Sequence, residues 1–86
     1  MDSSKLNRRI NKVIGQLNAV NRMLEEGRPC EDILIQLNAS KKAIHKVGQV
    51  LLEQELDMII EDKIEIGEVK EISNSFKKSL DLFSRL

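Results

Sequence analysis

Apolar residues recur every three or four positions through three segments of this chain, which is the pattern of helices with one apolar side. The first segment begins at Ser3 or Ser4, either of which can cap a helix. Its apolar positions alternate four and three residues apart, as in a coiled-coil seam: Leu6, Ile10, Val13, Leu17, Val20 and Leu24. The pattern predicts a helix over residues 4–26. Within it Gly15 costs about 1 kcal/mol relative to Ala, so we expect another backbone to approach closely there.

The second segment is the longest, and the pattern predicts a helix over residues 29–62. Gly27 is typical of the residue just past a helix C-terminus, and Pro29 suits the first turn of the next helix. The apolar positions form a broad stripe: Ile33, Leu34, Leu37, Ile44, Val47, Leu51, Leu52, Leu56, Ile59 and Ile60. Polar residues interrupt this stripe midway, at Asn38, Ser40, Lys41 and Lys42. They fit either a feature on a dimer axis or a surface that faces solvent.

A third helix is predicted over residues 67–84, with an apolar side made of Val69, Ile72, Phe76, Leu80 and Phe83. We therefore expect one all-helical domain, residues 1–86. The three apolar surfaces exceed what one chain can cover, and a domain of this length buries only about 60% of its unfolded surface. Association with further copies is expected.

The composition agrees with helices packed on helices. Hydrophobic residues make up 41% of the chain and aromatic residues 2%, so the core must consist mainly of Leu, Ile and Val. The single cysteine, Cys30, excludes an internal disulfide framework. Neither a signal peptide nor an apolar run long enough to cross a bilayer is present. We therefore expect a cytoplasmic protein with no membrane partner.

The net charge is zero, but the charges are distributed unevenly. Residues 1–46 carry nine Lys or Arg and five Asp or Glu, a net charge of +4, and residues 47–86 carry the opposite, a net charge of −4. Four cations, Lys5, Arg8, Arg9 and Lys12, share one helix face by their spacing. Two interpretations are open: a solvated polarity that helps chains associate, or a surface that binds phosphates.

Catalytic templates are missing from the sequence. There is no Gly-rich phosphate loop, no HExxH or CxxC zinc pattern and no arrangement typical of a Ser-His-Asp triad, so we do not expect an enzyme. Cys30 is the one residue with plausible chemistry, because the positive end of a helix dipole attracts a thiolate, although Glu31 and Asp32 oppose that attraction. The alternative is a small buried hydrophobe. His45 lies about 22 Å further along the same helix, too far to pair with Cys30 of its own chain.

Three segments together resemble the copper-sensing repressor (CsoR) family, which also contains nickel or cobalt, formaldehyde and persulfide sensors. They are residues 9–17 (RINKVIGQL), 23–37 (MLEEGRPCEDILIQL) and 51–56 (LLEQEL). The resemblance runs in the same order through nearly the whole chain. It implies a three-helix protomer, an antiparallel dimer with a four-helix bundle, and a tetramer of two such dimers.

The same resemblance implies a repressor that binds operator DNA and is released by an effector. The family's basic DNA-binding positions fall on Arg9, Lys12 and Lys46, and a polar position falls on Gln16. Arg8 is added from its place on the cationic face of the first helix. No cofactor follows from the residues themselves, whereas the resemblance implies a metal ion.

The effector site departs from the family pattern. Copper sensors combine the cysteine equivalent to Cys30 with a His and a Cys of the partner chain, and those positions hold Glu55 and Ile59 here. Cu(I) is therefore disfavoured, because it prefers thiolate and imidazole to carboxylate. A harder metal ion at Cys30 and Glu55, or a reactive molecule such as formaldehyde or a sulfur species at Cys30, are the open alternatives.

Two hypotheses from other classes accompany this one. An all-helical enzyme of chorismate mutase type would draw Arg8, Arg28 and Glu55 into an anion-binding pocket. A helical interaction protein without a sensor would bind neither DNA nor a small molecule. The effector, the operator and the choice between homodimer and homotetramer do not follow from the sequence.

Overall fold

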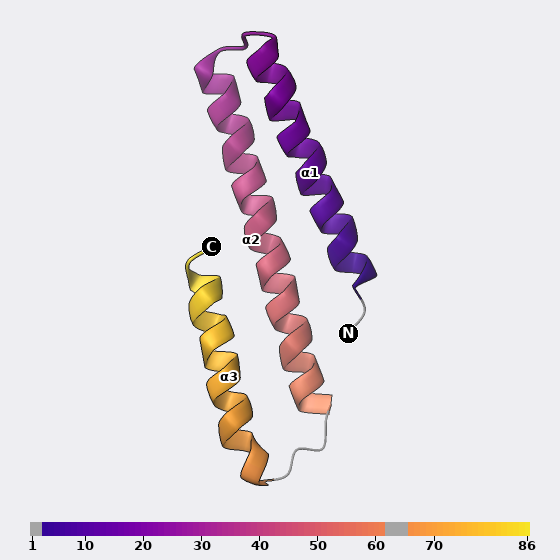
Figure 1. Ribbon diagram of the computed structural model, residues 1–86, viewed down its shortest axis with the longest axis vertical. Coiled ribbons are helices and arrows are strands. Elements are labelled where there is room, and N and C mark those ends of the chain that lie inside the picture. The colour runs from indigo at the N-terminus through magenta and orange to yellow at the C-terminus, as the bar shows by residue number, and fades with distance from the viewer. Residues whose placement is uncertain (1–2, 62–65) are drawn as a thin grey trace. The chain divides into compact units, whose positions relative to one another are not determined.

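The computed structural model describes residues 3–61 and 66–86, with side chains for 3–61 and 71–86. Three helices follow one another along the chain (Figure 1): α1, Ser4–Glu25; α2, Cys30–Glu61; and α3, Ile66–Ser84. The described residues contain no strand, so the protein is all-α as predicted. The chain divides into two compact units, one reaching to Val47 and the other running from Gly48 to the C-terminus.

The turn between α1 and α2 has the geometry that its sequence predicts. Gly27 has a φ of +67°, a left-handed conformation that glycine adopts without steric cost. Its N–H donates to the carbonyl of Leu24 at 3.2 Å, and the N–H of Arg28 donates to the carbonyl of Met23 at 2.9 Å. These two bonds form a Schellman motif, which satisfies carbonyls that α1 would otherwise leave without donors. The prediction that Gly27 ends the first helix is confirmed.

Capping at the start of α1 differs from the expectation. Ser3 occupies the N-cap position, but its side chain makes no capping hydrogen bond. Its backbone carbonyl accepts from the N–H of Asn7 at 2.8 Å, which is the first bond of the helix. The helix therefore begins at the predicted place without a capping bond from the Ser3 side chain.

In the unit that reaches to Val47, α1 runs antiparallel to the first part of α2 (Figure 1). The predicted seam of α1 divides in two: Val13 and Val20 are buried, with 5% and 7% exposure, whereas Ile10, Leu17 and Leu24 are exposed. One neighbouring helix covers only a narrow arc of α1, and alternate members of a four-three seam lie on either side of its centre. Half of the predicted seam is consequently left uncovered within the chain.

Ser40 is the most buried side chain described, with 1% exposure. Its hydroxyl donates to the carbonyl of Gln36, one turn earlier, at 3.1 Å, so burial leaves this polar group satisfied. The interpretation of Ser40 as part of a surface that faces solvent is therefore wrong, whereas Asn38, Lys41 and Lys42 are exposed.

The expectation for Gly15 is wrong within this chain. A Cβ at Gly15 would meet no heavy atom within 4 Å, and the residue is exposed. The close approach occurs instead at Gly48, where the end of α3 packs on α2 through Phe83 and Leu86. Sequence spacing does not distinguish the two glycines, because both lie inside helical patterns.

In the unit that begins at Gly48, the second part of α2 runs antiparallel to α3 (Figure 1). Val50 is buried, with 5% exposure, and three apolar side chains in the described part of α3 are half-buried: Ile72, Phe76 and Phe83. Leu80, which was expected on the same apolar side, is 46% exposed. The predicted contribution of Val69 lies outside the described side chains. No described helix is both long and apolar enough to cross a bilayer.

Candidate nucleic-acid interface and effector site

The cationic residues predicted to contact DNA differ in exposure. Arg8, Lys12 and Lys46 are exposed, and none of them forms an ion pair with another residue that the structure describes. Within the described residues the ion pairs are Arg28 with Asp32 at 3.3 Å and Arg85 with Asp81 at 2.9 Å. The three exposed cations are therefore available to an anionic partner.

Arg9 and Gln16 are half-buried rather than fully exposed. They lie seven residues apart, two turns along α1, beside the buried Val13 and Val20. Arg9 Nε and Gln16 Oε1 are excluded from solvent, and neither has a hydrogen-bond partner among the described residues. A buried polar atom without a partner costs about 1–3 kcal/mol. These two side chains thus form the border between the packed side of α1 and its cationic side.

The helical turn decides which residues share a side of the α1/α2 hairpin. Each residue advances about 100° around a helix, so Arg8 and Lys12 lie on one flank of the buried side of α1, and Ile10 and Leu17 lie on the other. Because α2 runs antiparallel to α1, successive residues of α2 advance in the opposite rotational direction when both helices are viewed from the N-terminal end of α1. This reversal places Lys46 on the same side of the hairpin as Arg8 and Lys12.

The opposite side of this hairpin is apolar and exposed. Leu37 and Ile44 of α2 fall on it together with Ile10 and Leu17 of α1. Their exposures are 41%, 38%, 41% and 41% respectively, high values for large aliphatic side chains. The hairpin therefore has a cationic side and an apolar side, separated by the helix contact itself.

Cys30 is the first residue of α2, as predicted, and it is exposed. The alternative of a small buried hydrophobe is therefore wrong for the single chain. Glu31 and Asp32 follow in the first turn of the helix, and the Asp32 carboxylate accepts from the Arg28 guanidinium at 3.3 Å. His45 lies fifteen residues further along α2 and is exposed too.

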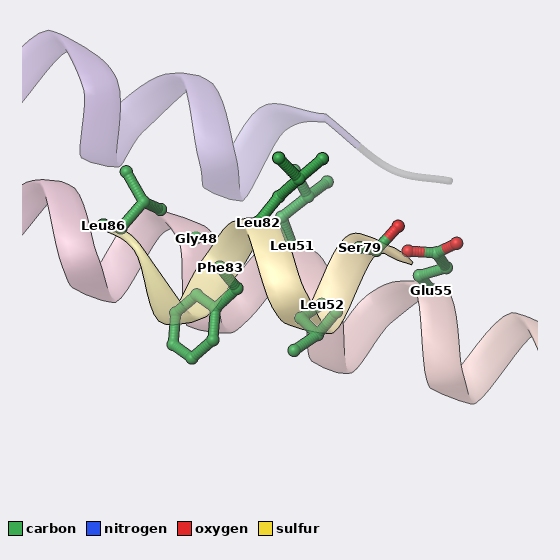
Figure 2. Close-up of a pocket in the computed structure, with 8 residues that line it drawn as sticks. All are labelled: Gly48, Leu51, Leu52, Glu55, Ser79, Leu82, Phe83 and Leu86. Atoms are coloured by element: carbon green, nitrogen blue, oxygen red, sulfur yellow. The ribbon is translucent and has the colours of Figure 1, made fainter. Parts of the chain in front are cut away.

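The second predicted effector residue, Glu55, belongs to the other compact unit. It is half-buried, as is Ile59 one turn later. Figure 2 shows Glu55 among the residues that line a cavity of about 370 Å³ between α2 and α3. Among the described residues no group of three or more His, Cys, Asp or Glu side chains is placed to hold a metal ion. The described part of one chain therefore does not by itself bring together three such donors.

Three residues of structural importance were missed or misread from the sequence. The sequence pattern singles out neither Gly48 nor Ser79, and it marks Ser40 only as a polar interruption. Gly48 and Ser79 line the cavity between α2 and α3. A signal for Ser79 was available, because it lies seven residues after Ile72 and three after Phe76, on the apolar side of α3.

The residues proposed for a mutase-type pocket belong to different compact units. In the unit that reaches to Val47, Arg28 pairs with Asp32 in the turn before α2, and Arg8 is exposed near the start of α1. Glu55 lines the cavity in the other unit.

Comparison with known proteins supplies the family. The family described as "Metal-sensitive transcriptional repressor" matches residues 2–79. The copper-sensing transcriptional repressor CsoR of Bacillus subtilis (strain 168) is 30% identical over 81 residues, which are 90% of this chain and 80% of that protein. The copper-sensing transcriptional repressor RicR of Mycobacterium tuberculosis is 37% identical over 49 residues, 57% of this chain and 51% of that protein.

A solved structure has the same fold. The nickel-responsive transcriptional regulator InrS superimposes with a TM-score of 0.85 at 28% sequence identity, over 96% of this chain and 93% of that one. The names of these relatives describe transcriptional regulators and not enzymes. The match over residues 2–79, the curated relatives and the shared three-helix fold lead to one conclusion: this chain belongs to the family of metal-sensitive transcriptional repressors.

Proposed function

We propose that this protein represses transcription by binding operator DNA through the cationic side of its α1/α2 hairpin, and that an effector sensed at Cys30 releases it. The observation that carries the proposal is the shared side of Arg8, Lys12 and Lys46. Two of these residues come from α1 and one from α2, and the antiparallel packing brings them to one surface. Operator binding requires the protein to act in the cytoplasm.

The DNA contact is chiefly electrostatic. Exposed Lys and Arg side chains neutralise backbone phosphates and release counterions, so binding falls steeply with salt. Arg9 and Gln16 border the same side, where Arg9 Nε and Gln16 Oε1 are excluded from solvent. We assign Arg8, Lys12 and Lys46 to phosphates, and Arg9 and Gln16 to contacts at the edge of the same surface.

Association of copies is the second part of the proposal. The apolar side formed by Ile10, Leu17, Leu37 and Ile44 is exposed in the single chain, and a surface of this kind is a common protein interface. An antiparallel dimer that buries it would form a four-helix bundle and leave the cationic sides outward. Two such dimers would make the homotetramer implied by the family resemblance.

The effector part rests on Cys30 and Glu55. Cys30 is exposed at the start of α2, where an incoming ion or electrophile reaches its sulfur. Cu(I) is disfavoured because Glu55 and Ile59 replace the His and Cys that it requires. A harder metal ion between Cys30 of one chain and Glu55 of another, or a molecule that reacts with Cys30 alone, are the two forms of this proposal.

DNA binding is tested by gel shift on the promoter of the protein's own gene, with Arg8→Ala, Arg9→Ala and Arg22→Ala. Arg22 is an exposed arginine of the same helix, fourteen residues and about 21 Å further along α1 than Arg8. We expect a salt-sensitive complex that Arg8→Ala and Arg9→Ala weaken and Arg22→Ala preserves. Absence of a salt-sensitive complex, or equal binding by all three variants, would contradict the proposal.

The effector is tested by release of that DNA with Cu(I), Zn(II), Ni(II), formaldehyde and polysulfide in turn. Each active agent is then repeated on Cys30→Ala and on Glu55→Gln. Release that needs both residues indicates a metal ion, whereas release that needs Cys30 alone indicates a reactive molecule. Release that survives Cys30→Ala would place the sensor elsewhere in the protein.

A further inference from the structure

The cavity between the second part of α2 and α3 has a volume of about 370 Å³, within the range of sites that bind small molecules. Both of its walls belong to one compact unit of the chain. Leu51 and Leu52 of α2 face Leu82 and Phe83 of α3 across it (Figure 2). The greater part of the lining is therefore apolar.

The two ends of the cavity differ in chemistry. Figure 2 shows the Glu55 carboxylate and the Ser79 hydroxyl together at one end, while Gly48 and Leu86 lie at the other. Gly48 and Glu55 are seven residues apart on α2, about 10 Å at the usual rise per residue. A ligand that fills this space needs a polar head and an apolar tail of roughly that length.

The polar end of the cavity favours a ligand whose head group donates hydrogen bonds. An ionised carboxylate only accepts hydrogen bonds, and it favours a positively charged donor. The ion pairs and hydrogen bonds of the described residues do not occupy Glu55 or Ser79. The Ser79 hydroxyl, which lies beside the Glu55 carboxylate, can accept a second hydrogen bond from the same head group.

We propose that this cavity binds a primary alkylammonium ion, with the ammonium group on Glu55 and Ser79 and the alkyl chain between Leu52 and Phe83. The site is formed by α2 and α3 of one chain, so it depends neither on DNA binding nor on Cys30. Glu55 also belongs to the metal form of the effector proposal, and binding measured without DNA or metal distinguishes the two sites.

The test is titration of the full-length protein with octylammonium, followed by ¹³C-labelled leucine methyl signals and calorimetry without DNA. We expect shifts at Leu51, Leu52 and Leu82. Hexylammonium, two methylenes shorter, should bind about tenfold more weakly. Octanoate, which carries the opposite charge on the same chain, should not bind at this end.

Substitution of the polar end gives the second part of the test. Glu55→Gln keeps the size of the side chain and removes its charge, and it should weaken octylammonium binding about tenfold. Asp57→Asn removes the same charge from an exposed residue outside the lining and should change binding less than twofold. Ser79→Ala should weaken octylammonium binding several-fold. It replaces Glu55→Gln in this test if the Glu55→Gln protein does not fold.

Three outcomes would overturn the proposal. Octylammonium and octanoate could bind equally well, or Glu55→Gln could bind octylammonium as the wild type does. Mixed labelled and unlabelled chains could instead show intermolecular contacts at Leu51 and Leu82. That result would mean that a second copy of the chain fills the cavity.

Discussion

A Cβ atom at Gly48 would lie 2.5 Å from Cδ1 of Leu86 and 3.1 Å from Cδ1 of Phe83. The last turn of the chain thus packs directly on the backbone of α2, at the point where the second compact unit begins. Glycine is required here for space and not for an unusual backbone angle, because Gly48 lies within a regular helix. Gly15 occupies a similar place in α1 but has open space around it.

Alanine substitutions at the two glycines should therefore differ. Gly15→Ala should raise the free energy of unfolding by about 1 kcal/mol, the gain in helix propensity. Gly48→Ala receives the same gain but must displace Leu86 and shift Phe83, so its net effect should be at least about 1 kcal/mol less favourable. Urea denaturation at one protein concentration measures both.

A third variant identifies the cause. Removal of Leu86 from the Gly48→Ala chain should recover part of the lost stability, because the nearest clash disappears. Equal gains from Gly15→Ala and Gly48→Ala would contradict the packing of α3 on Gly48. A loss of stability from Gly15→Ala would show that another chain approaches α1 there.

Gly27→Ala should destabilise the turn between α1 and α2. Gly27 has a φ of +67°, and an L-residue with a Cβ pays about 1–2 kcal/mol in that conformation. Gly27→Asn should cost less, because asparagine tolerates the left-handed region better. Thermal unfolding followed by circular dichroism gives the order of the three proteins. Equal stability of Gly27→Ala and wild type would contradict the left-handed turn.

Lys46→Ala should weaken operator binding more than Lys41→Ala does. Both residues are exposed lysines of α2, and the helical turn places Lys41 away from the cationic side that contains Lys46. Loss of one phosphate contact should reduce the slope of log K against log salt by about 0.9. The slope is measured by fluorescence anisotropy of labelled DNA over a range of salt concentrations.

Similar slopes for Lys46→Ala and wild type would indicate that Lys46 of α2 does not contact a DNA phosphate. Loss of binding by Lys41→Ala to the same degree would indicate that total charge, and not position, governs affinity. Circular dichroism of both variants establishes that each remains helical.

Leu17→Lys and Ile44→Lys should each reduce association of the chains. The two residues lie on the apolar side of the α1/α2 hairpin, and a charge buried in an interface without a partner is costly. Ile60→Lys is the control, because Ile60 is 71% exposed and lies off that side. Sedimentation velocity measures the mass of each species.

The expected result is a shift to smaller species for Leu17→Lys and Ile44→Lys, with Ile60→Lys resembling the wild type. Unchanged association of the first two variants would exclude the apolar side as the interface. A shift to smaller species for Ile60→Lys alone would indicate that the chains associate through the other end of α2.

Much of the local structure follows from the sequence. The three helices begin and end within one residue of the ranges that the apolar spacing indicates, because that spacing and the turn residues act over a few neighbouring positions. Gly27 is the clearest case, since one residue type meets the need for a left-handed backbone. The placement of Cys30 at the start of α2 follows from the same turn.

Residues close together along the chain are enough to predict that it is helical, where its turn lies and which segments are cationic. The packing of one helix on another determines which half of the α1 seam is buried, that Ser40 lies inside, that Gly48 and not Gly15 meets a neighbour, and that Glu55 borders a cavity. Neighbouring positions do not predict these contacts, because an apolar or small residue on a helix fits several neighbours equally well. Its role is settled only when another helix covers one arc of the surface and leaves the rest exposed.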